Sequence, residues 1–141
     1  MRYHVVAVGR MKDAALRAAC DGYLRRLRHY ARVEELEVKH EARILGAIPD
    51  GSRLVALSRA GDAWTSRGLA ELTKTWERDG RDVVFAIGGP TTLAPEVLRR
   101  ADVVWSLSAL TLPHELARVV VLEQLYRAYT IRRGTPYHRG P

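Results

Sequence analysis

The chain contains one cysteine, Cys20, and no apolar run that approaches the length of a membrane span. A single cysteine excludes an internal disulfide and a metal site built on several thiolates. A transmembrane helix needs about 18 or more consecutive apolar residues. The N-terminal residues also lack the apolar core and the small-residue cleavage site of a signal peptide. We therefore expect a reduced, cytoplasmic protein that has no contact with a membrane.

Two common nucleotide-binding motifs are also missing. The dinucleotide fingerprint G-x-G-x-x-G does not occur, and neither does the P-loop pattern G-x-x-x-x-G-K-[ST]. These absences argue against a nicotinamide-dependent dehydrogenase and against a P-loop NTPase. No pair of carboxylates, cluster of metal ligands or nucleophile with a neighbouring base stands out at a diagnostic spacing.

The composition is that of an ordinary globular protein. Hydrophobic residues make up 47% and charged residues 28% of the 141 residues, a length that can bury a core as one domain. The formal net charge is +7, which makes the chain a candidate for nucleic-acid binding. A genome that favours arginine codons gives the same charge without a nucleic-acid partner, so both interpretations stay open.

Acidic residues are absent after Glu123. Four arginines follow it: Arg127, Arg132, Arg133 and Arg139. Such a cationic segment suits a phosphate backbone. Within the closing Tyr137-His138-Arg139, the tyrosine can stack on a base, the histidine can relay a proton near neutral pH, and the arginine can contact phosphate. A frayed terminus is the alternative for the same residues.

The hydrophobic pattern predicts strands that alternate with helices. Strands are expected over 3–8, 33–38, 53–57, 82–87 and 103–107. Helices are expected over 13–29, from 65 or 66 to 80, from Pro95 onward, and over 113–131, with Asp13, Thr65 or Ser66, and Thr111 as N-caps. Residues 59–62 are expected to form a loop. Strands that are apolar on both faces indicate an α/β fold whose parallel sheet is covered by helices on both faces.

Ligands of open α/β sheets bind beyond the carboxyl ends of the strands. Three loops are expected there: after Leu57, at Gly88-Gly89-Pro90, and after Leu107. The two glycines allow a sharp turn and a close approach of a ligand to the backbone, although a plain strand–helix turn has the same residues. The apolar side chains of Leu107, Leu110 and Leu112 can wall a flat aromatic ligand such as adenine, while loop amides read its edge.

Two further interpretations concern residues near these loops and the last helix. Arg59, Asp62 and Trp64 are interpreted as a solvent-exposed polar loop, and His114 as a structural residue at a helix start. The last helix is apolar over most of its circumference, which predicts burial on more than one side. The sheet covers one side, so a second copy of the chain can cover the other, and a homodimer is plausible.

Several segments taken together resemble the ribosomal RNA large subunit methyltransferase H family. The resemblance rests on Val6-Ala7-Val8-Gly9, Asp79-Gly80-Arg81-Asp82-Val83, Ile87-Gly88-Gly89-Pro90, the block from Trp105 to His114, the helix residues Glu123, Leu125, Tyr126, Arg127 and Ala128, and Pro136-Tyr137-His138-Arg139. It covers nearly the whole chain. The Ser-Leu-Ser-Ala-Leu-Thr-Leu-Pro-His block and the Tyr-His-Arg end are its most specific parts.

The resemblance implies properties that the hydrophobic pattern does not. Residues 1–141 would form one SPOUT-type domain whose C-terminal segment is tucked into a trefoil knot, a topology that general rules treat as near-absent. The protein would be a homodimer that binds S-adenosylmethionine in a bent form and methylates N3 of a pseudouridine in 23S rRNA of the assembled ribosome, without metal or DNA. By matched position, the cofactor-binding residues would be Leu57, Gly88, Leu107, Ser108, Ala109, Leu110, Thr111 and Leu112, and the substrate-side catalytic residues Tyr137, His138 and Arg139.

The implied reaction needs no metal, because the methyl carbon of a sulfonium is already electrophilic. An imide N–H titrates well above the unperturbed histidine pKa of about 6.5, so His138 cannot remove that proton beforehand. We expect His138 or water to take the proton during transfer, while Arg139 and Arg132 hold phosphate and the developing anion. Two alternatives stay open: a non-catalytic RNA-binding module, and an α/β enzyme that acts on a small molecule.

One region departs from the family pattern. Members of the family are somewhat longer, and the missing residues are expected around 39–52, where a helix is usual. Only residues 41–48 remain of that helix here, so the contacts that the helix makes in the family, including any with the ribosome, are not carried over to this chain.

Overall fold

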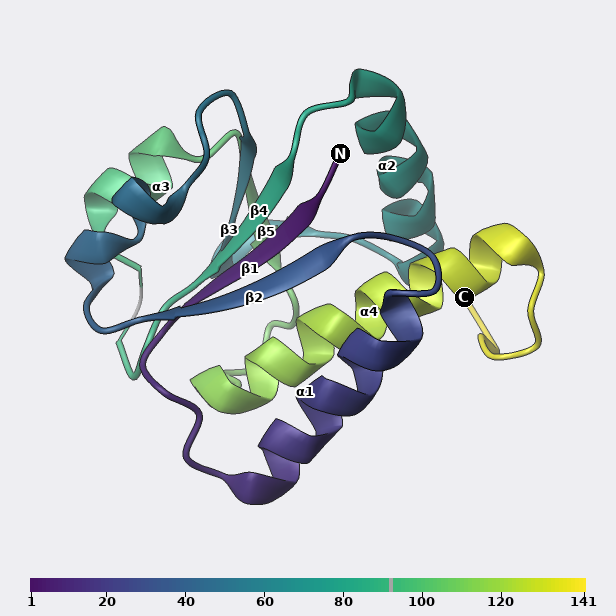
Figure 1. Ribbon diagram of the computed structural model, residues 1–141, viewed down its shortest axis with the longest axis horizontal. Coiled ribbons are helices and arrows are strands. Elements are labelled where there is room, and N and C mark those ends of the chain that lie inside the picture. The colour runs from purple at the N-terminus through teal and green to yellow at the C-terminus, as the bar shows by residue number, and fades with distance from the viewer. Residues whose placement is uncertain (92) are drawn as a thin grey trace.

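The computed structural model describes residues 1–91 and 93–141, and within these ranges five parallel strands form one sheet. The strands are β1 (Tyr3–Val8), β2 (Val33–Val38), β3 (Arg53–Ala63), β4 (Val83–Ile87) and β5 (Val103–Ser106), and their order is β2-β1-β4-β3-β5 (Figure 1). The helices are α1 (Ala14–Leu27), α2 (Ser66–Asp79), α3 (Pro95–Arg100) and α4 (His114–Arg133). The predicted parallel α/β fold is confirmed.

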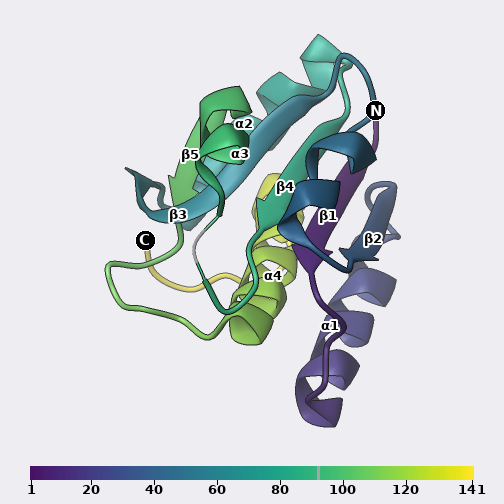
Figure 2. The same cartoon turned by 90° about the vertical axis from the view of Figure 1, so that its left-hand side faces the viewer.

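Helices cover both faces of the sheet, as predicted. The larger core lies between one face and the helices α1, α2 and α4, and it contains Tyr3, Phe85 and Leu122. The smaller core lies on the opposite face under α3 and two short 3-10 helices, η1 (Glu41–Arg43) and η2 (Leu45–Ala47). Figure 2 faces this smaller side, with α2 and α4 behind the sheet. All five residues of β4 are buried, because this central strand has a packed layer on each side.

Local capping explains where two of the helices start and where one ends. The carboxylate of Asp13 accepts hydrogen bonds from the backbone N–H groups of Ala15 and Leu16, and the Thr65 hydroxyl accepts one from Gly68. α2 ends at Gly80, which has a left-handed backbone. The predicted capping of α4 by Thr111 is wrong. Pro113 is the N-cap and no side chain caps the helix, so Thr111 lies two residues too early to reach the first free N–H groups.

The predicted loop at residues 59–62 is also wrong, because β3 continues to Ala63. Leu57 and Asp62 both pair with Trp105, so the residues between them form a bulge. A Cβ atom on Gly61 would lie 2.5 Å from the carbonyl carbon and oxygen of Val104. The glycine therefore permits the bulge to rest directly on the backbone of β5.

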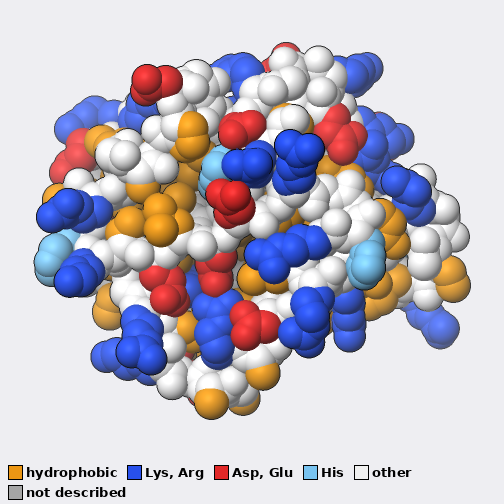
Figure 3. All heavy atoms as spheres, viewed as in Figure 1, with side chains coloured by type: hydrophobic (Ala, Val, Ile, Leu, Met, Phe, Trp, Pro, Cys, Tyr) orange, Lys and Arg blue, Asp and Glu red, His pale blue; other side chains and the backbone are white. Residues whose placement is uncertain are grey.

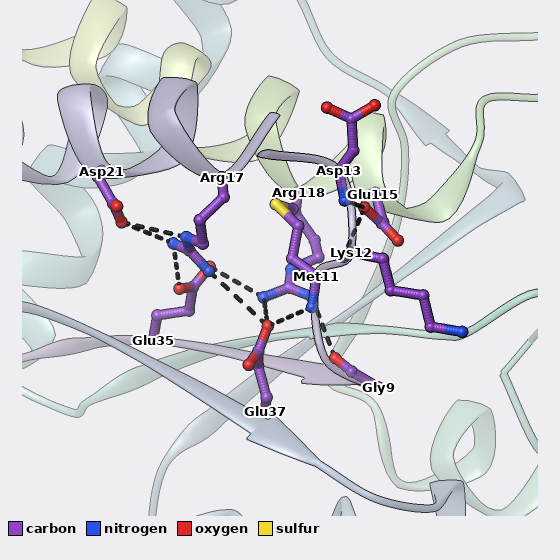
Figure 4. A network of polar contacts seen from close by, with 10 residues as sticks. All are labelled: Gly9, Met11, Lys12, Asp13, Arg17, Asp21, Glu35, Glu37, Glu115 and Arg118. Atoms are coloured by element: carbon purple, nitrogen blue, oxygen red, sulfur yellow. Dashed lines mark hydrogen bonds and ion pairs between the residues drawn. The ribbon is translucent and has the colours of Figure 1, made fainter. Parts of the chain in front are cut away.

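A buried arginine joins α4 to the ends of β1 and β2 (Figure 4). Arg118 is 1% exposed, and it donates hydrogen bonds to Glu37 at 2.6 Å, to Glu35 at 3.2 Å and to the carbonyl of Gly9 at 3.2 Å. Burial alone would raise the pKa of Glu37, but the hydrogen bonds from Arg118 and from the Met11 backbone outweigh burial and lower it. This network holds the first half of α4 in place.

Two further observations bear on the class of protein. Among the described helices, none combines the length and the apolar character that a membrane span requires. Within residues 1–91 and 93–141, no group of three or more His, Cys, Asp or Glu side chains is arranged to hold a metal ion.

Candidate cofactor pocket and C-terminal tail

A pocket of about 680 Å³ lies at the carboxyl edge of the sheet. It is lined by the bulge of β3, by the loops after β4 and β5 and by the start of α4. The three predicted segments therefore converge on one cavity, although the first of them belongs to a strand. Its volume is that of a typical small-molecule site. Seven of the eight predicted cofactor-binding residues line it: Leu57, Gly88, Leu107, Ser108, Leu110, Thr111 and Leu112. The eighth, Ala109, belongs to the same loop and is exposed.

The loop after β5 is shaped by its own serines. The Ser106 hydroxyl donates to the carbonyl of Ser108 at 3.1 Å, and the Ser108 hydroxyl accepts from the backbone N–H of Leu110 at 2.9 Å. These bonds hold the loop in a turn that leaves the Leu110 side chain 73% exposed. A large apolar side chain at the rim of an apolar pocket is suited to cover a bound ligand.

The loop after β4 passes close to the end of β1. A Cβ atom on Gly89 would lie 3.3 Å from the Val8 side chain, a tight contact that glycine avoids. Gly88, the preceding residue, lines the pocket. This contact explains the glycine at position 89 by packing within the chain, and the predicted close approach of a ligand to the backbone stays a prediction.

Sequence reasoning missed several residues of the pocket wall, among them Arg59 and His114. Of the described residues that line the pocket, Arg59 alone carries a permanent charge, and none is acidic. The interpretation of Arg59, Asp62 and Trp64 as a solvent-exposed loop is therefore wrong in part. Trp64 is half-buried and stacks on Trp105, with ring centroids 4.7 Å apart. No local pattern signals this stacking, because the strand pairing of β3 with β5 creates it.

The C-terminal tail, residues 135–141, packs against the other end of α4. The Tyr137 hydroxyl donates to Glu123 at 2.8 Å, and its ring meets the Tyr126 ring edge-on at 4.9 Å. Burial and the hydrogen bond to Glu123 raise the pKa of Tyr137. His138 is bonded to Arg127, whereas Arg139 is exposed. Tyr137 and His138 are thus held on α4 and are not frayed.

The bond between His138 and Arg127 defines the imidazole tautomer. Nδ1 of His138 lies 3.1 Å from Nη1 of Arg127. A guanidinium only donates hydrogen bonds, so Nδ1 must accept, and the neutral ring carries its proton on Nε2. Nε2 is buried and has no hydrogen-bond partner among the described residues. In this arrangement Nε2 is a donor and cannot act as a base.

Two of the four C-terminal arginines are engaged by acidic residues from earlier in the chain. Arg127 pairs with Glu123 at 2.7 Å, and Arg132 pairs with Glu77 at 2.6 Å. The hydrogen bond from Arg132 lowers the pKa of Glu77. The expectation that Arg132 holds phosphate therefore conflicts with its place in the fold. Arg133 and Arg139 are exposed and form no ion pair within the described residues.

The pocket and the tail lie at opposite ends of α4 (Figure 1). The helix has 20 residues, which at 1.5 Å per residue span about 30 Å. His114 at its first turn lines the pocket, whereas Glu123 and Arg127 in its second half hold the tail. Within one chain, the predicted substrate-side residues therefore do not meet the predicted cofactor-binding residues.

The fold and the site define an α/β protein with a small-molecule pocket where a strand bulge and two loops meet at the carboxyl edge of a parallel sheet. Comparison with known proteins gives the family. The family model described as "Predicted SPOUT methyltransferase" matches residues 1–138, and the chain belongs to this family of methyltransferases.

Curated relatives support the same assignment. The ribosomal RNA large subunit methyltransferase H of Paraburkholderia phymatum is 40% identical over 155 residues, which cover 99% of this chain and 99% of that protein. The methyltransferase H of Burkholderia mallei is 40% identical over 156 residues, covering 99% and 100%. Both alignments are longer than the 141 residues of this chain, so the relatives are the longer proteins, as the family resemblance predicts.

Solved structures share the fold at low sequence identity. The A. aeolicus TrmH/SpoU tRNA modifying enzyme has a TM-score of 0.56 and 15% identity, covering 94% of this chain and 77% of that chain. The SpoU methyltransferase AviRb from Streptomyces viridochromogenes, solved in complex with the cofactor AdoMet, has a TM-score of 0.55 and 14% identity, covering 89% and 57%. The resemblance to a SPOUT-type methyltransferase family is thereby confirmed.

Proposed function

We propose that this protein is a cytoplasmic, S-adenosylmethionine-dependent methyltransferase that modifies N3 of a pseudouridine in 23S rRNA of the assembled ribosome. The observation that carries the proposal is the convergence of the β3 bulge and the loops after β4 and β5 on one pocket in a chain of this family. The methyltransferase H relatives are named for the large-subunit rRNA. The net charge of +7 suits an RNA substrate.

The chemistry of the pocket fits the cofactor. Leu57, Leu110 and Leu112 offer apolar walls for adenine, and the turn at residues 88–90 leaves its backbone accessible. Arg59 would pair with the carboxylate of the methionine group, which is the one anion of the ligand. When bound, S-adenosylmethionine supplies an electrophilic methyl group. The residues of this chain need only hold and orient it, and orientation alone can contribute about 7–11 kcal/mol.

The proposal includes the trefoil knot within one domain over residues 1–141. Its support is the path of the chain after β5. This strand lies at the edge of the sheet beside β3, and the loop at residues 107–113 then leads back to α4, which packs on α1 and α2. The bulge of β3 and the loops after β4 and β5 share one pocket, so they run close together where a knot would thread.

A homodimer would bring the two separated parts of the site together. On α4, Leu116 and Val120 are half-buried, and they are not among the half-buried apolar residues of this helix that pack against the larger core. A second copy that covers this strip could place its Tyr137, His138 and Arg139 near the pocket of the first. The length of α4 favours this arrangement, because one chain cannot supply both parts.

The tautomer of His138 favours water as the acceptor of the N3 proton. With Nδ1 occupied by Arg127, His138 would donate Nε2–H to a carbonyl oxygen of the target base, and the tail would have to shift to expose Nε2, which is buried in the single chain. That bond would stabilise the negative charge that develops as the proton leaves. Arg139 would hold a neighbouring phosphate.

Single-turnover rates on bound ribosomes test the role of His138. His138→Gln keeps an N–H donor near the position of Nε2, and His138→Ala removes it. We expect the glutamine variant to retain most of the rate that the alanine variant loses. An equal loss of roughly 10²–10⁴-fold in both variants would instead identify His138 as a general base.

The proposed function as a whole is tested by two measurements on the wild-type protein. Calorimetry should show binding of S-adenosylmethionine and of its demethylated product, whereas a non-catalytic RNA-binding module would bind neither. Mass spectrometry of 23S rRNA should show a new methyl group at a pseudouridine after incubation with ribosomes. Activity that does not fall as salt rises would indicate a small-molecule enzyme, because RNA binding weakens steeply with salt.

A further inference from the structure

The arginines of this chain divide into two groups. Many of them bind a carboxylate: Arg2, Arg17, Arg53, Arg81, Arg100, Arg118, Arg127 and Arg132. Others form no ion pair within the described residues, and at the end of α1 several such basic side chains follow one another closely in the chain. We call these residues, together with one from α4, the α1 basic surface: Arg25, Arg26, Arg28, His29, Arg32 and Arg133.

Aromatic rings hold this surface together. The guanidinium of Arg133, at the end of α4, lies over the Tyr30 ring at 5.5 Å, and Tyr30 stacks on Tyr129 of α4 at 5.8 Å. The guanidinium of Arg26 lies over the rings of Tyr23 and Tyr126 at 5.4 and 5.8 Å. On the face shown in Figure 3, Lys and Arg side chains gather over this part of the molecule, with a His side chain among them. The ends of α1 and α4 therefore form one cationic surface.

A guanidinium stacked on a ring is positioned without using its hydrogen-bond donors. Ring contact takes up the face of the planar group, and the N–H edges stay free for a bidentate acceptor. In the paired arginines, by contrast, a carboxylate already takes these donors. Several like charges close together repel one another, so the α1 basic surface is suited to an anionic partner with regularly spaced charges.

The surface is also continuous with the tail. Arg26 lies over Tyr126, and Tyr126 meets the ring of Tyr137 at 4.9 Å. Tyr137 belongs to the segment that we expect to face the substrate. An RNA strand that places one nucleotide at the tail would therefore run its backbone past the end of α1.

We propose that the α1 basic surface binds the phosphate backbone of rRNA beside the modified nucleotide. The inference rests on the proposed function and assigns it a docking surface. Phosphates along an RNA strand supply the repeated acceptors that stacked and exposed guanidinium groups would bind.

Two double variants of equal charge test the proposal. The surface pair, Arg25→Gln with Arg32→Gln, removes two arginines from the α1 basic surface. The control pair, Arg67→Gln with Arg99→Gln, removes two exposed arginines from α2 and α3. Each pair lowers the net charge from +7 to +5. None of these four side chains forms an ion pair in residues 1–91 and 93–141, so neither pair removes one from the fold.

The readout is binding to purified large ribosomal subunits over a range of salt concentrations. We expect the surface pair to weaken binding about tenfold. It should also make the slope of log K against log salt concentration shallower by about 1.4–1.8, because each of the two lost phosphate contacts contributes roughly 0.7–0.9 to that slope. The control pair should change both quantities far less. An unchanged slope for the surface pair, or an equal loss in the control, would overturn the proposal.

Two further measurements distinguish an RNA-docking surface from a part of the cofactor site and from a dimer interface. Calorimetry of the surface pair with S-adenosylmethionine should give the wild-type affinity, because neither residue lines the pocket. Sedimentation should give the wild-type oligomeric state, and dissociation of the surface pair would instead make the surface an interface between copies of the chain. Failure of the wild-type protein to bind ribosomes would contradict the proposed function, whereas unaltered binding by the surface pair would contradict only the docking surface.

Discussion

The two ends of α4 are surrounded by different kinds of residues. At its first turn, the pocket is walled by leucines, small residues and backbone, with Arg59 as the one permanently charged residue among the described lining residues. At its last turns, arginines, acidic residues and tyrosines interlock through hydrogen bonds and ring contacts. Apolar walls bind a ligand through shape and desolvation, whereas charged groups recognise a polyanion at a surface. The contrast suggests that the cofactor and the RNA engage separate regions of the fold.

The largest effect is expected from removing the residue that fixes the first half of α4. Arg118→Ala would leave Glu35, Glu37 and the Gly9 carbonyl without their buried partner. We expect the free energy of unfolding to fall by about 3 kcal/mol, at the lower end of the range for breaking a buried pair, because Glu37 is partly exposed. Urea unfolding measures this loss. Arg17→Ala, in the same network but at the surface, should cost about 1 kcal/mol or less; equal losses would contradict a special role for the buried arginine.

A smaller effect, confined to the pocket end, is expected from Gly61→Ala. The added methyl group would press on the Val104 backbone, so the bulge of β3 must move. We expect a loss of about 1–3 kcal/mol in unfolding free energy, the usual cost of overpacking, with weaker binding of S-adenosylmethionine. Thermal unfolding and calorimetry measure the two quantities. Gly46→Ala is the control, because a Cβ there has no neighbour within 4 Å; similar behaviour of both variants would rule out the proposed contact.

Leu110→Ala should separate cofactor binding from stability. Because the Leu110 side chain is 73% exposed, its truncation should leave the unfolding free energy nearly unchanged. Loss of the apolar contact with the cofactor should weaken binding by about tenfold, from roughly 1.4 kcal/mol of lost burial. Leu36→Ala on β2, where the side chain is 46% exposed, is the matched control and should leave affinity unaltered. Wild-type affinity for Leu110→Ala would remove this residue from the site.

The smallest effect is a change in acid stability at the tail end. The bond to Arg132 lowers the pKa of Glu77, so between the lowered value and the ordinary value of about 4.3 the unfolded chain binds more protons than the folded one. The stabilisation is therefore present above the ordinary value and is lost as pH falls through the lowered one. In Glu77→Gln, the loss of unfolding free energy on acidification should be smaller than in the wild-type protein by about 1 kcal/mol. The difference is small because the pair is partly exposed.

Chemical unfolding at pH 3 to 7 measures that dependence. Glu96→Gln on α3 is the control, because Glu96 is exposed and forms no hydrogen bond with another described side chain. A pH dependence that the Glu77 variant shares with the wild-type protein would show that this ion pair does not couple folding to pH.

Local patterns predicted most of the elements. The alternation of strands and helices, the caps at Asp13 and Thr65, and the end of α2 at Gly80 all follow from side chains within a few residues of one another. The loops after β4 and β5 were predicted in the same way, whereas the loop predicted after Leu57 is a bulge of β3. Their convergence follows from parallel strands, whose carboxyl ends share one edge of a sheet.

The errors arose where a distant contact overrules the local pattern. Residues 59–62 have the polar and glycine content of a turn, yet pairing with β5 continues the strand through them. Thr111 is a suitable capping residue, but the helix starts later, after Pro113. The stacking of Trp64 on Trp105 likewise depends on which strands are neighbours.

By itself, the sequence determined the α/β class, the helix ends and the residues available for a pocket, because these depend on periodicity and on side chains near in the chain. Tertiary structure alone decided the long-range pairs of arginine and carboxylate, since Arg118 and Glu37 lie 81 residues apart. It also decided that the tail packs on Glu123 and Arg127 of α4, more than two helical turns from His114 at the pocket. Both outcomes depend on strand order and helix packing, which bring together or separate groups irrespective of their spacing along the chain.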